Sequence, residues 1–71
     1  MAIRYNKLWK LLVDRKMSKA DLRKAVGMAP NTLTKMRRDE PVSLEILIRI
    51  CECLSCDIGD VMELVPKEEA V

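Results

Sequence analysis

Residues 18–38 read SKADLRKAVGMAPNTLTKMRR, and this stretch decides the fold. Ser18 is typical of a helix N-cap, because its hydroxyl can accept a backbone N–H, and Asp21 three residues later completes an acidic capping box. Gly27 is typical of the residue that follows a helix, where the backbone commonly enters the left-handed region. Pro30 suits the first position of the next helix, where no backbone N–H is needed. Two short helices joined by so tight a turn predict a helix-turn-helix.

The flanking segments predict three further helices. Apolar residues recur at helical spacing over residues 6–15, and a serine N-cap opens a second such segment over residues 43–54. A short last helix is expected over residues 58–64 because its apolar residues keep a helical spacing up to a proline that stops it. Residues 67–71 are expected to form a frayed tail.

The whole chain, residues 1–71, is therefore predicted to form one all-α domain of five helices, since a chain of this length holds a single small core. Only Tyr5 and Trp9 are aromatic, so aliphatic side chains must build that core. In chain order, the residues expected to face inward are Leu8, Leu11, Leu12, Leu22, Ala25, Val26, Leu33, Met36, Leu44, Leu47, Ile50, Cys51 and Leu54, and the last helix is expected to use Ile58, Val61, Met62 and Leu64.

Charge is segregated along the chain. Residues 1–38 hold eleven Lys and Arg against two Asp, a formal charge of +9, whereas residues 39–71 hold two cations against nine acids, a charge of −7. A domain with one basic half is expected to bind polyanions through that half. A generally solvated surface explains the number of charges but not their segregation.

The helix expected over residues 30–38 has an outer face with the chemistry of a DNA-reading surface. Asn31 can pair bidentately with adenine, Lys35 can donate to guanine, and the Thr32 methyl group can touch a thymine methyl. Phosphate contacts are expected from Lys19, Thr34, Arg37 and Arg38. The alternative is a merely solvated helix face, but the tight turn and the charge split favour insertion into the major groove of duplex DNA.

The segment 18–38 resembles the Cro/CI-type (Xre), lambda-repressor-like helix-turn-helix family. The resemblance rests on Ser18, Leu22, Ala25, Gly27, Thr32, Leu33 and Met36. The later run SLEILIRICECLSCDIGDVMEL is similar to the fourth and fifth helices of that family, so nearly the whole chain is covered. The opening YNKLWKLL is similar to small VanU-type regulators, which occur in glycopeptide-resistance operons of Gram-positive bacteria.

This resemblance implies a bacterial transcriptional regulator in which the first residue of the second helix, Lys19, contacts a phosphate. It implies base contacts from Pro30, Asn31, Thr32 and Lys35. Two departures from the family pattern matter. Ala29 stands where a polar N-cap is usual, and Pro30 can offer a base only an apolar contact. Base recognition is therefore expected to depend mainly on Asn31 and Lys35.

One short helix contacts few base pairs, so specificity is expected to need a homodimer on a two-fold operator. Apolar residues outside the predicted core indicate a surface for the second copy. These residues are Ile46, Ile48, Cys53, Ile58 and Met62. An alternative function is an antitoxin-like or adaptor module, whose acidic half binds a protein partner and whose DNA binding is secondary.

The motif C-x-C-x-x-C, formed by Cys51, Cys53 and Cys56, is a possible metal or redox site. Residues two apart on a helix point about 200° apart, however, so Cys51 is expected to face the core and Cys53 to face away from it. A zinc site would also lack a fourth ligand, because the chain has no histidine. Structural cysteines are favoured, with copper or iron–sulfur sensing as a minor alternative, and no metal or cofactor is expected.

Catalysis is not expected either. The chain lacks a histidine for a general base, a glycine-rich phosphate loop and a carboxylate pair at a cleft. No continuous apolar stretch resembles a signal peptide or a membrane span, and three cysteines are an unpromising disulfide framework. The expected compartment is the reducing cytoplasm.

Overall fold

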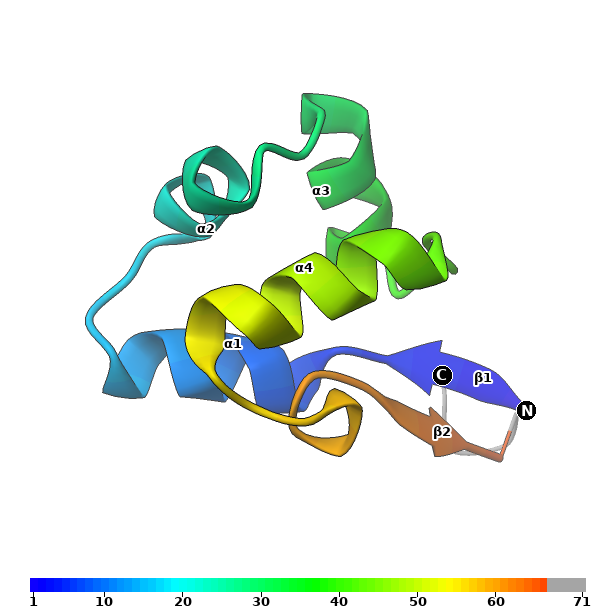
Figure 1. The fold of residues 1–71 in the computed structure, drawn as a ribbon. Helices are drawn as coiled ribbons and strands as arrows, with labels where there is room; N and C mark the ends of the chain where they lie inside the picture. Colours follow the sequence, from blue (N-terminus) through cyan, green and yellow to red (C-terminus); the bar gives the residue numbers. More distant parts are fainter. Residues whose placement is uncertain (67–71) are drawn as a thin grey trace.

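The computed structural model describes residues 1–66, so the frayed tail predicted over residues 67–71 lies outside the described residues. The four α-helices are α1 (Asn6–Asp14), α2 (Lys19–Val26), α3 (Pro30–Arg37) and α4 (Leu44–Leu54). A single turn of 3-10 helix, η1 (Ile58–Asp60), follows α4. Strands β1 (Ala2–Arg4) and β2 (Glu63–Val65) lie side by side at the two ends of the described chain, with α4 crossing in front of α1 (Figure 1).

The strand pair corrects the all-α prediction, and the prediction of a fifth helix over residues 58–64 is wrong. Only η1 is helical in that segment, and the chain then extends into β2, which pairs antiparallel with β1. Ile3 lies opposite Leu64 and Arg4 opposite Glu63. Pairing satisfies the backbone groups of both short segments, and this tertiary contact overrides the local helical spacing of the apolar residues.

The helix ends around the helix-turn-helix agree with the predicted signals. The Asp21 N–H donates to Ser18 Oγ, and the Ser18 N–H donates to Asp21 Oδ2, both at 2.9 Å, so the capping box is complete. Gly27 adopts the left-handed conformation with φ of 75° and ends α2. Ala29 is extended and caps α3 without a side-chain hydrogen bond, and Pro30 opens α3. The turn is therefore built by the residues that predicted it.

A continuous core lies where α1, α2 and α4 meet, and most of its members were expected. Four residues assigned to the apolar faces of predicted helices are exposed instead: Ala25 in α2, Leu44 in α4, Ile58 in η1 and Leu64 in β2. By helical geometry Ala25 lies roughly 80° from the middle of the stripe formed by Leu22 and Val26, and Leu44 lies roughly 90° from the middle of the buried face of α4. On α4, Ile46 packs at the edge of the core in place of Leu44, although Ile46 was expected to lie outside the core.

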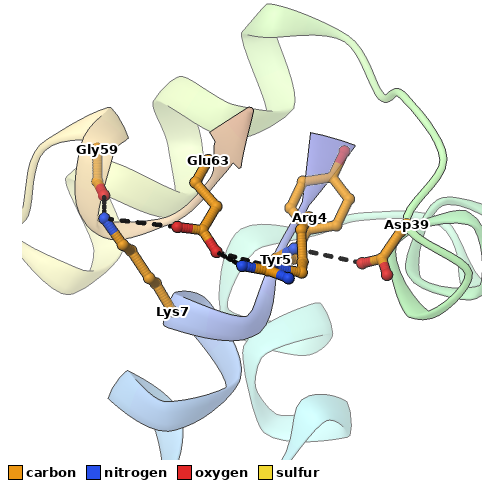
Figure 2. Close-up of polar contacts among 6 residues, drawn as sticks. All are labelled: Arg4, Tyr5, Lys7, Asp39, Gly59 and Glu63. Carbon is orange, nitrogen blue, oxygen red and sulfur yellow. Dashed lines mark hydrogen bonds and ion pairs between the residues drawn. The ribbon is translucent and has the colours of Figure 1, made fainter. Parts of the chain in front are cut away.

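Polar contacts fasten the strand pair to the start of α1 (Figure 2). Arg4 Nη2 lies 2.6 Å from Glu63 Oε1, and Arg4 Nε donates a hydrogen bond to the same oxygen at 2.8 Å. The Lys7 ammonium lies 3.9 Å from Glu63 Oε2 and donates to the Gly59 carbonyl at 3.4 Å. The hydrogen bond from Arg4 is the main cause that lowers the pKa of the Glu63 carboxyl. Arg4 and Lys7, two cations of the basic half, therefore stabilise the fold through contacts with Glu63.

Candidate nucleic-acid interface

Helix α3 is held to the domain by its apolar side. Met36 is completely buried, and Leu33, one turn earlier, packs against the same core. Met28, in the turn before α3, is also buried, so the turn itself is anchored. Helix α2 packs on both α3 and α4. The opposite side of α3 is left facing outward.

Tyr5 contacts the loop that follows the C-terminal end of α3 and holds it in place. Its side chain is completely buried, and its hydroxyl donates to the Glu40 carbonyl at 2.8 Å. Its backbone N–H donates to Asp39 Oδ1 at 3.3 Å (Figure 2). Burial and, next, the negative charge of Asp39 raise the pKa of the Tyr5 phenol. The start of α1 thereby holds the loop that follows α3, which sets the direction of that helix.

Three of the four residues predicted to contact bases lie at the free side of α3, and the fourth, Thr32, lies at its border with the anchored side. Pro30, Asn31 and Lys35 are exposed, and Thr32 is half-buried. Asn31 and Lys35 are four residues apart, so their side chains share one face of the helix. Since Pro30 lies in the first turn, the exposed face begins at the N-terminal end that a recognition helix presents to base edges.

The residues predicted to contact phosphates divide into two kinds. Lys19, Arg37 and Arg38 are exposed cations. Thr34 is exposed too, but its hydroxyl donates to the Pro30 carbonyl at 3.1 Å. The proton of that hydroxyl is therefore already engaged within α3, and Thr34 is a weaker candidate for a phosphate contact than the three cations.

The electrostatics of α2 and α3 favour an anion. Residues 18–38 contain six Lys and Arg residues and one acidic residue, Asp21. The carboxylate of Asp21 accepts the Ser18 backbone N–H, which is the main cause that lowers its pKa and keeps it engaged at the helix end. Among residues 1–66, no ion pair involves a cation of α2 or α3. The positive charge of this surface is thus not neutralised by the acidic half of the described chain.

The residues predicted to form a dimer surface do not all lie outward. Ile46 and Met62 are half-buried and pack against the core. Ile48, Cys53 and Ile58 are exposed. Ile48 and Cys53 are five residues apart on α4 and point roughly 140° apart, so they belong to different faces. The exposed apolar residue that shares a side with Ile48 is Leu44, one turn earlier.

The cysteines follow the predicted orientations. Cys51 packs against the core and Cys53 is exposed. The Cys56 N–H donates to the Cys51 carbonyl at 3.0 Å, which closes the end of α4. Burial raises the pKa of the Cys56 thiol, and Cys51 beside it adds to the effect. Among residues 1–66, no three His, Cys, Asp or Glu side chains converge as metal ligands.

An open cleft of about 540 Å³ lies between α1, the end of α4 and η1. Its lining includes Lys10, Arg15, Cys56 and Asp60 but no residue of α2 or α3. The cleft is therefore separate from the outer face of the helix-turn-helix. No helix within residues 1–66 is long and apolar enough to cross a bilayer.

The sequence did not indicate that Tyr5 and Trp9 support the surface formed by α2 and α3. Tyr5 was not expected to fix the end of α3, and Trp9 was noted in the sequence only as one of two aromatic residues. The Lys19 ammonium lies over the Trp9 ring, 4.3 Å from its centroid. Both contacts join residues on different elements, so helical spacing within one segment could not indicate them.

Comparisons with known proteins agree with this geometry. The model of the Cro/C1-type HTH DNA-binding domain matches residues 7–67. Among solved structures, the chain is similar to the transcriptional regulator VanUg in its crystal form II, with 52% identity and a TM-score of 0.91 over 93% of this chain and 88% of that chain. No curated protein matches. Proteins of this kind are generally not enzymes. The chain belongs to the Cro/C1-type helix-turn-helix DNA-binding domain family.

Proposed function

We propose that the chain is a sequence-specific transcriptional regulator of the bacterial cytoplasm that inserts α3 into the major groove of an operator. One observation carries this proposal. Asn31 and Lys35 share the exposed face of α3, while Met36 anchors the opposite face in the core. The related structure supports the regulatory part, because its protein is described as a transcriptional regulator.

Each exposed residue of this surface has a distinct role in the proposal. Asn31 and Lys35 recognise bases by hydrogen bonds, and the half-buried Thr32 offers its methyl group to a thymine. Pro30 contributes an apolar contact at the edge of the groove. Phosphate contacts come from Lys19, Arg37 and Arg38, which set the position of α3 on the duplex.

The proposal includes a dimer on a two-fold operator. The surface predicted from the sequence narrows to α4, where the side chains of Leu44 and Ile48 are 61% and 49% exposed and lie one turn apart. Two large apolar side chains on one exposed helix face favour association with a second copy. A second copy also doubles the number of base pairs contacted, which one helix of eight residues needs for a specific site.

Footprinting on the DNA upstream of the chain's own gene, at two salt concentrations, tests the proposal. A discrete protected region is expected, with affinity falling steeply as salt rises, because several phosphate contacts release counterions. A protein-binding adaptor would instead give no discrete footprint.

Two substitutions separate the roles on the duplex. Asn31→Ala should relax base preference at one position by roughly 1–3 kcal/mol. Lys19→Ala should weaken binding to all sequences alike and reduce the salt dependence by about one counterion per protomer. Equal loss of preference from both substitutions would contradict the assignment of roles.

A further inference from the structure

We infer that Trp9 belongs to the DNA-binding surface as a positioning residue, whose indole ring holds the Lys19 ammonium ready for a phosphate of the duplex. The inference rests on the proposed function, because it concerns how the protein engages that duplex. It adds a residue of α1 to a surface otherwise formed by α2 and α3.

The contact joins two elements. Lys19 is the first residue of α2, and its Nζ lies 4.3 Å from the centroid of the Trp9 ring. This distance is well within the range of a cation–π interaction, and tryptophan is the aromatic side chain that binds a cation most strongly. Trp9 is itself half-buried and packs against the core, so the ring is a fixed support rather than a mobile one.

The chemistry of the ring leaves the ammonium competent to bind DNA. A carboxylate partner would neutralise the charge of Lys19, but among residues 1–66 this side chain makes no ion pair. An indole carries no net charge and occupies only one side of an ammonium that has three N–H donors. The full positive charge and the remaining donors are therefore available to a phosphate oxygen.

The support also reduces the entropy lost on binding. A free lysine side chain populates many rotamers, and holding it against a phosphate removes that freedom. When the ammonium already rests on a ring in the unbound protein, part of this loss has occurred during folding, so DNA binding is tighter. The position of Lys19 adds to the effect, because the capping box leaves the backbone N–H groups of Lys19 and Ala20 free, and these groups attract the same anion.

A mutant cycle in DNA binding tests the inference. The full chain and its variants Trp9→Leu, Trp9→Phe, Lys19→Ala and the Trp9→Leu/Lys19→Ala double variant are titrated with a mixed-sequence duplex of roughly two helical turns at low salt. Trp9→Leu should weaken binding by roughly 2- to 5-fold, because the cost of immobilising the Lys19 side chain, about 0.5–1 kcal/mol, then falls on DNA binding. Trp9→Phe should recover most of that loss, and in the Lys19→Ala background Trp9→Leu should have no further effect.

Leu11→Ala is the matched control, since Leu11 also lies on α1 and packs against the core. It should lower stability and leave DNA affinity unchanged. An equal loss from Trp9→Leu with and without Lys19, or no recovery by Trp9→Phe, overturns the inference while wild-type binding still supports the proposed function. Failure of the wild-type chain to bind the duplex at low salt overturns both.

Fluorescence gives a second readout that does not require a substitution of the ring. Trp9 is the single tryptophan of the chain, so all indole emission reports on its surroundings. Lys19→Met should alter this emission in the free protein, and duplex DNA should alter it in the wild type but much less in Lys19→Met. Identical spectra of the wild type and Lys19→Met would show that the ammonium does not rest on the ring, which overturns the inference even if Trp9→Leu does not fold.

Discussion

Tyr5 shows how one side chain can orient a surface to which it does not belong. It lies before α1, yet its hydroxyl donates to the Glu40 carbonyl beyond the end of α3. The ring is buried, so the hydroxyl has exchanged water for partners in the protein, of which this carbonyl accepts its proton. Loss of the hydroxyl would leave the carbonyl with less hydrogen bonding in a confined site.

Tyr5→Phe should lower the free energy of unfolding by about 1 kcal/mol, the usual net value of such a hydrogen bond. Urea denaturation of the two proteins measures the difference. DNA affinity should also fall, because the loop after α3 loses a constraint on its position. An unchanged unfolding midpoint would show that the hydrogen bond contributes nothing.

The same residue should give the fold an alkaline limit. The pKa of Tyr5 is raised in the folded protein, so as pH increases the unfolded chain loses its phenolic proton first. The stability associated with Tyr5 is complete below the ordinary value of 10.0 and is lost as pH rises from there through the folded-state value. The thermal midpoint of the wild type should therefore fall more steeply above this pH than that of Tyr5→Phe. Parallel curves would contradict this assignment.

At the residue scale, much of the candidate interface was predictable. Asn31, Lys35 and Arg37 are exposed because the phase of α3 is set by Leu33 and Met36, which the sequence displays at helical spacing. Ala25 and Leu44 were misplaced because each lies near the border of a buried face, where a small error in helical phase decides burial. Trp9 could not be placed, since its partner Lys19 lies on another helix.

At the ends of the helices, the residue types in the sequence determine how much backbone strain the chain carries. All four α-helices are followed by a residue with positive φ, but only Gly27 among these is a glycine. The other three are Lys16, Asp39 and Ser55, with φ values between 52° and 57°. L-residues adopt this conformation at a cost of about 1 kcal/mol, so the helix ends of this chain differ in strain.

Two opposite substitutions test this difference. A Cβ added at Gly27 would meet no atom within 4 Å, so Gly27→Ala should destabilise the fold by about 1 kcal/mol through the backbone conformation alone. Ser55→Gly should stabilise it by up to the same amount. Urea unfolding midpoints measure both changes. A stabilising Gly27→Ala or a strongly destabilising Ser55→Gly would contradict the account of the helix ends.

The strand pair should make the fold sensitive to acid. The pKa of Glu63 is lowered in the folded protein, mainly by the hydrogen bond from Arg4. The stabilisation is therefore present above the ordinary value of 4.5 and is lost as pH falls through the lower folded-state value. The thermal midpoint of the wild type should drop below this pH more steeply than that of Glu63→Gln. Asp21→Asn is a useful comparison, because the pKa of Asp21 is lowered too. An identical acid profile for Glu63→Gln would remove the role of this ion pair.

The elements were predictable where their signals are local. Ser18, Gly27 and Pro30 each act within a few residues of their own position, and the structure retains all three signals. The strand pair joins segments 59 residues apart and only three residues long, so no local pattern could indicate it. The apolar residues Val61 and Leu64 suggested a helix, but β-pairing with the N-terminus determines the conformation there.

Across the whole molecule, the charge split serves both the fold and the proposed function. Arg4 and Lys7 contact Glu63, which connects the basic and acidic halves at the strand pair. The helix-turn-helix lies on the other side of α4 from this pair (Figure 1) and holds an excess of cations. Its exposed charge, together with the apolar face of α4, suits a dimer that binds a polyanion.

The proposed dimer should depend on α4. Ile48→Asp should shift the protein towards monomer in sedimentation equilibrium and reduce cooperative binding to a two-fold operator, because a charge at an apolar interface must be desolvated. Val13→Asp is the matched control, since Val13 on α1 is also an exposed apolar residue and is 75% exposed. Its sedimentation should equal that of the wild type. If Ile48→Asp changed neither property, the second copy would have to use another surface.

The most direct test of the central claim is a backbone-amide NMR titration of the full chain with duplex DNA at low salt. The account predicts that chemical shift changes concentrate at the start of α2 and along α3, around Lys19, Asn31 and Lys35, and fade as salt is added. Changes confined to η1 and β2, or no changes under these conditions, would contradict the assignment of α3 as the surface that meets DNA.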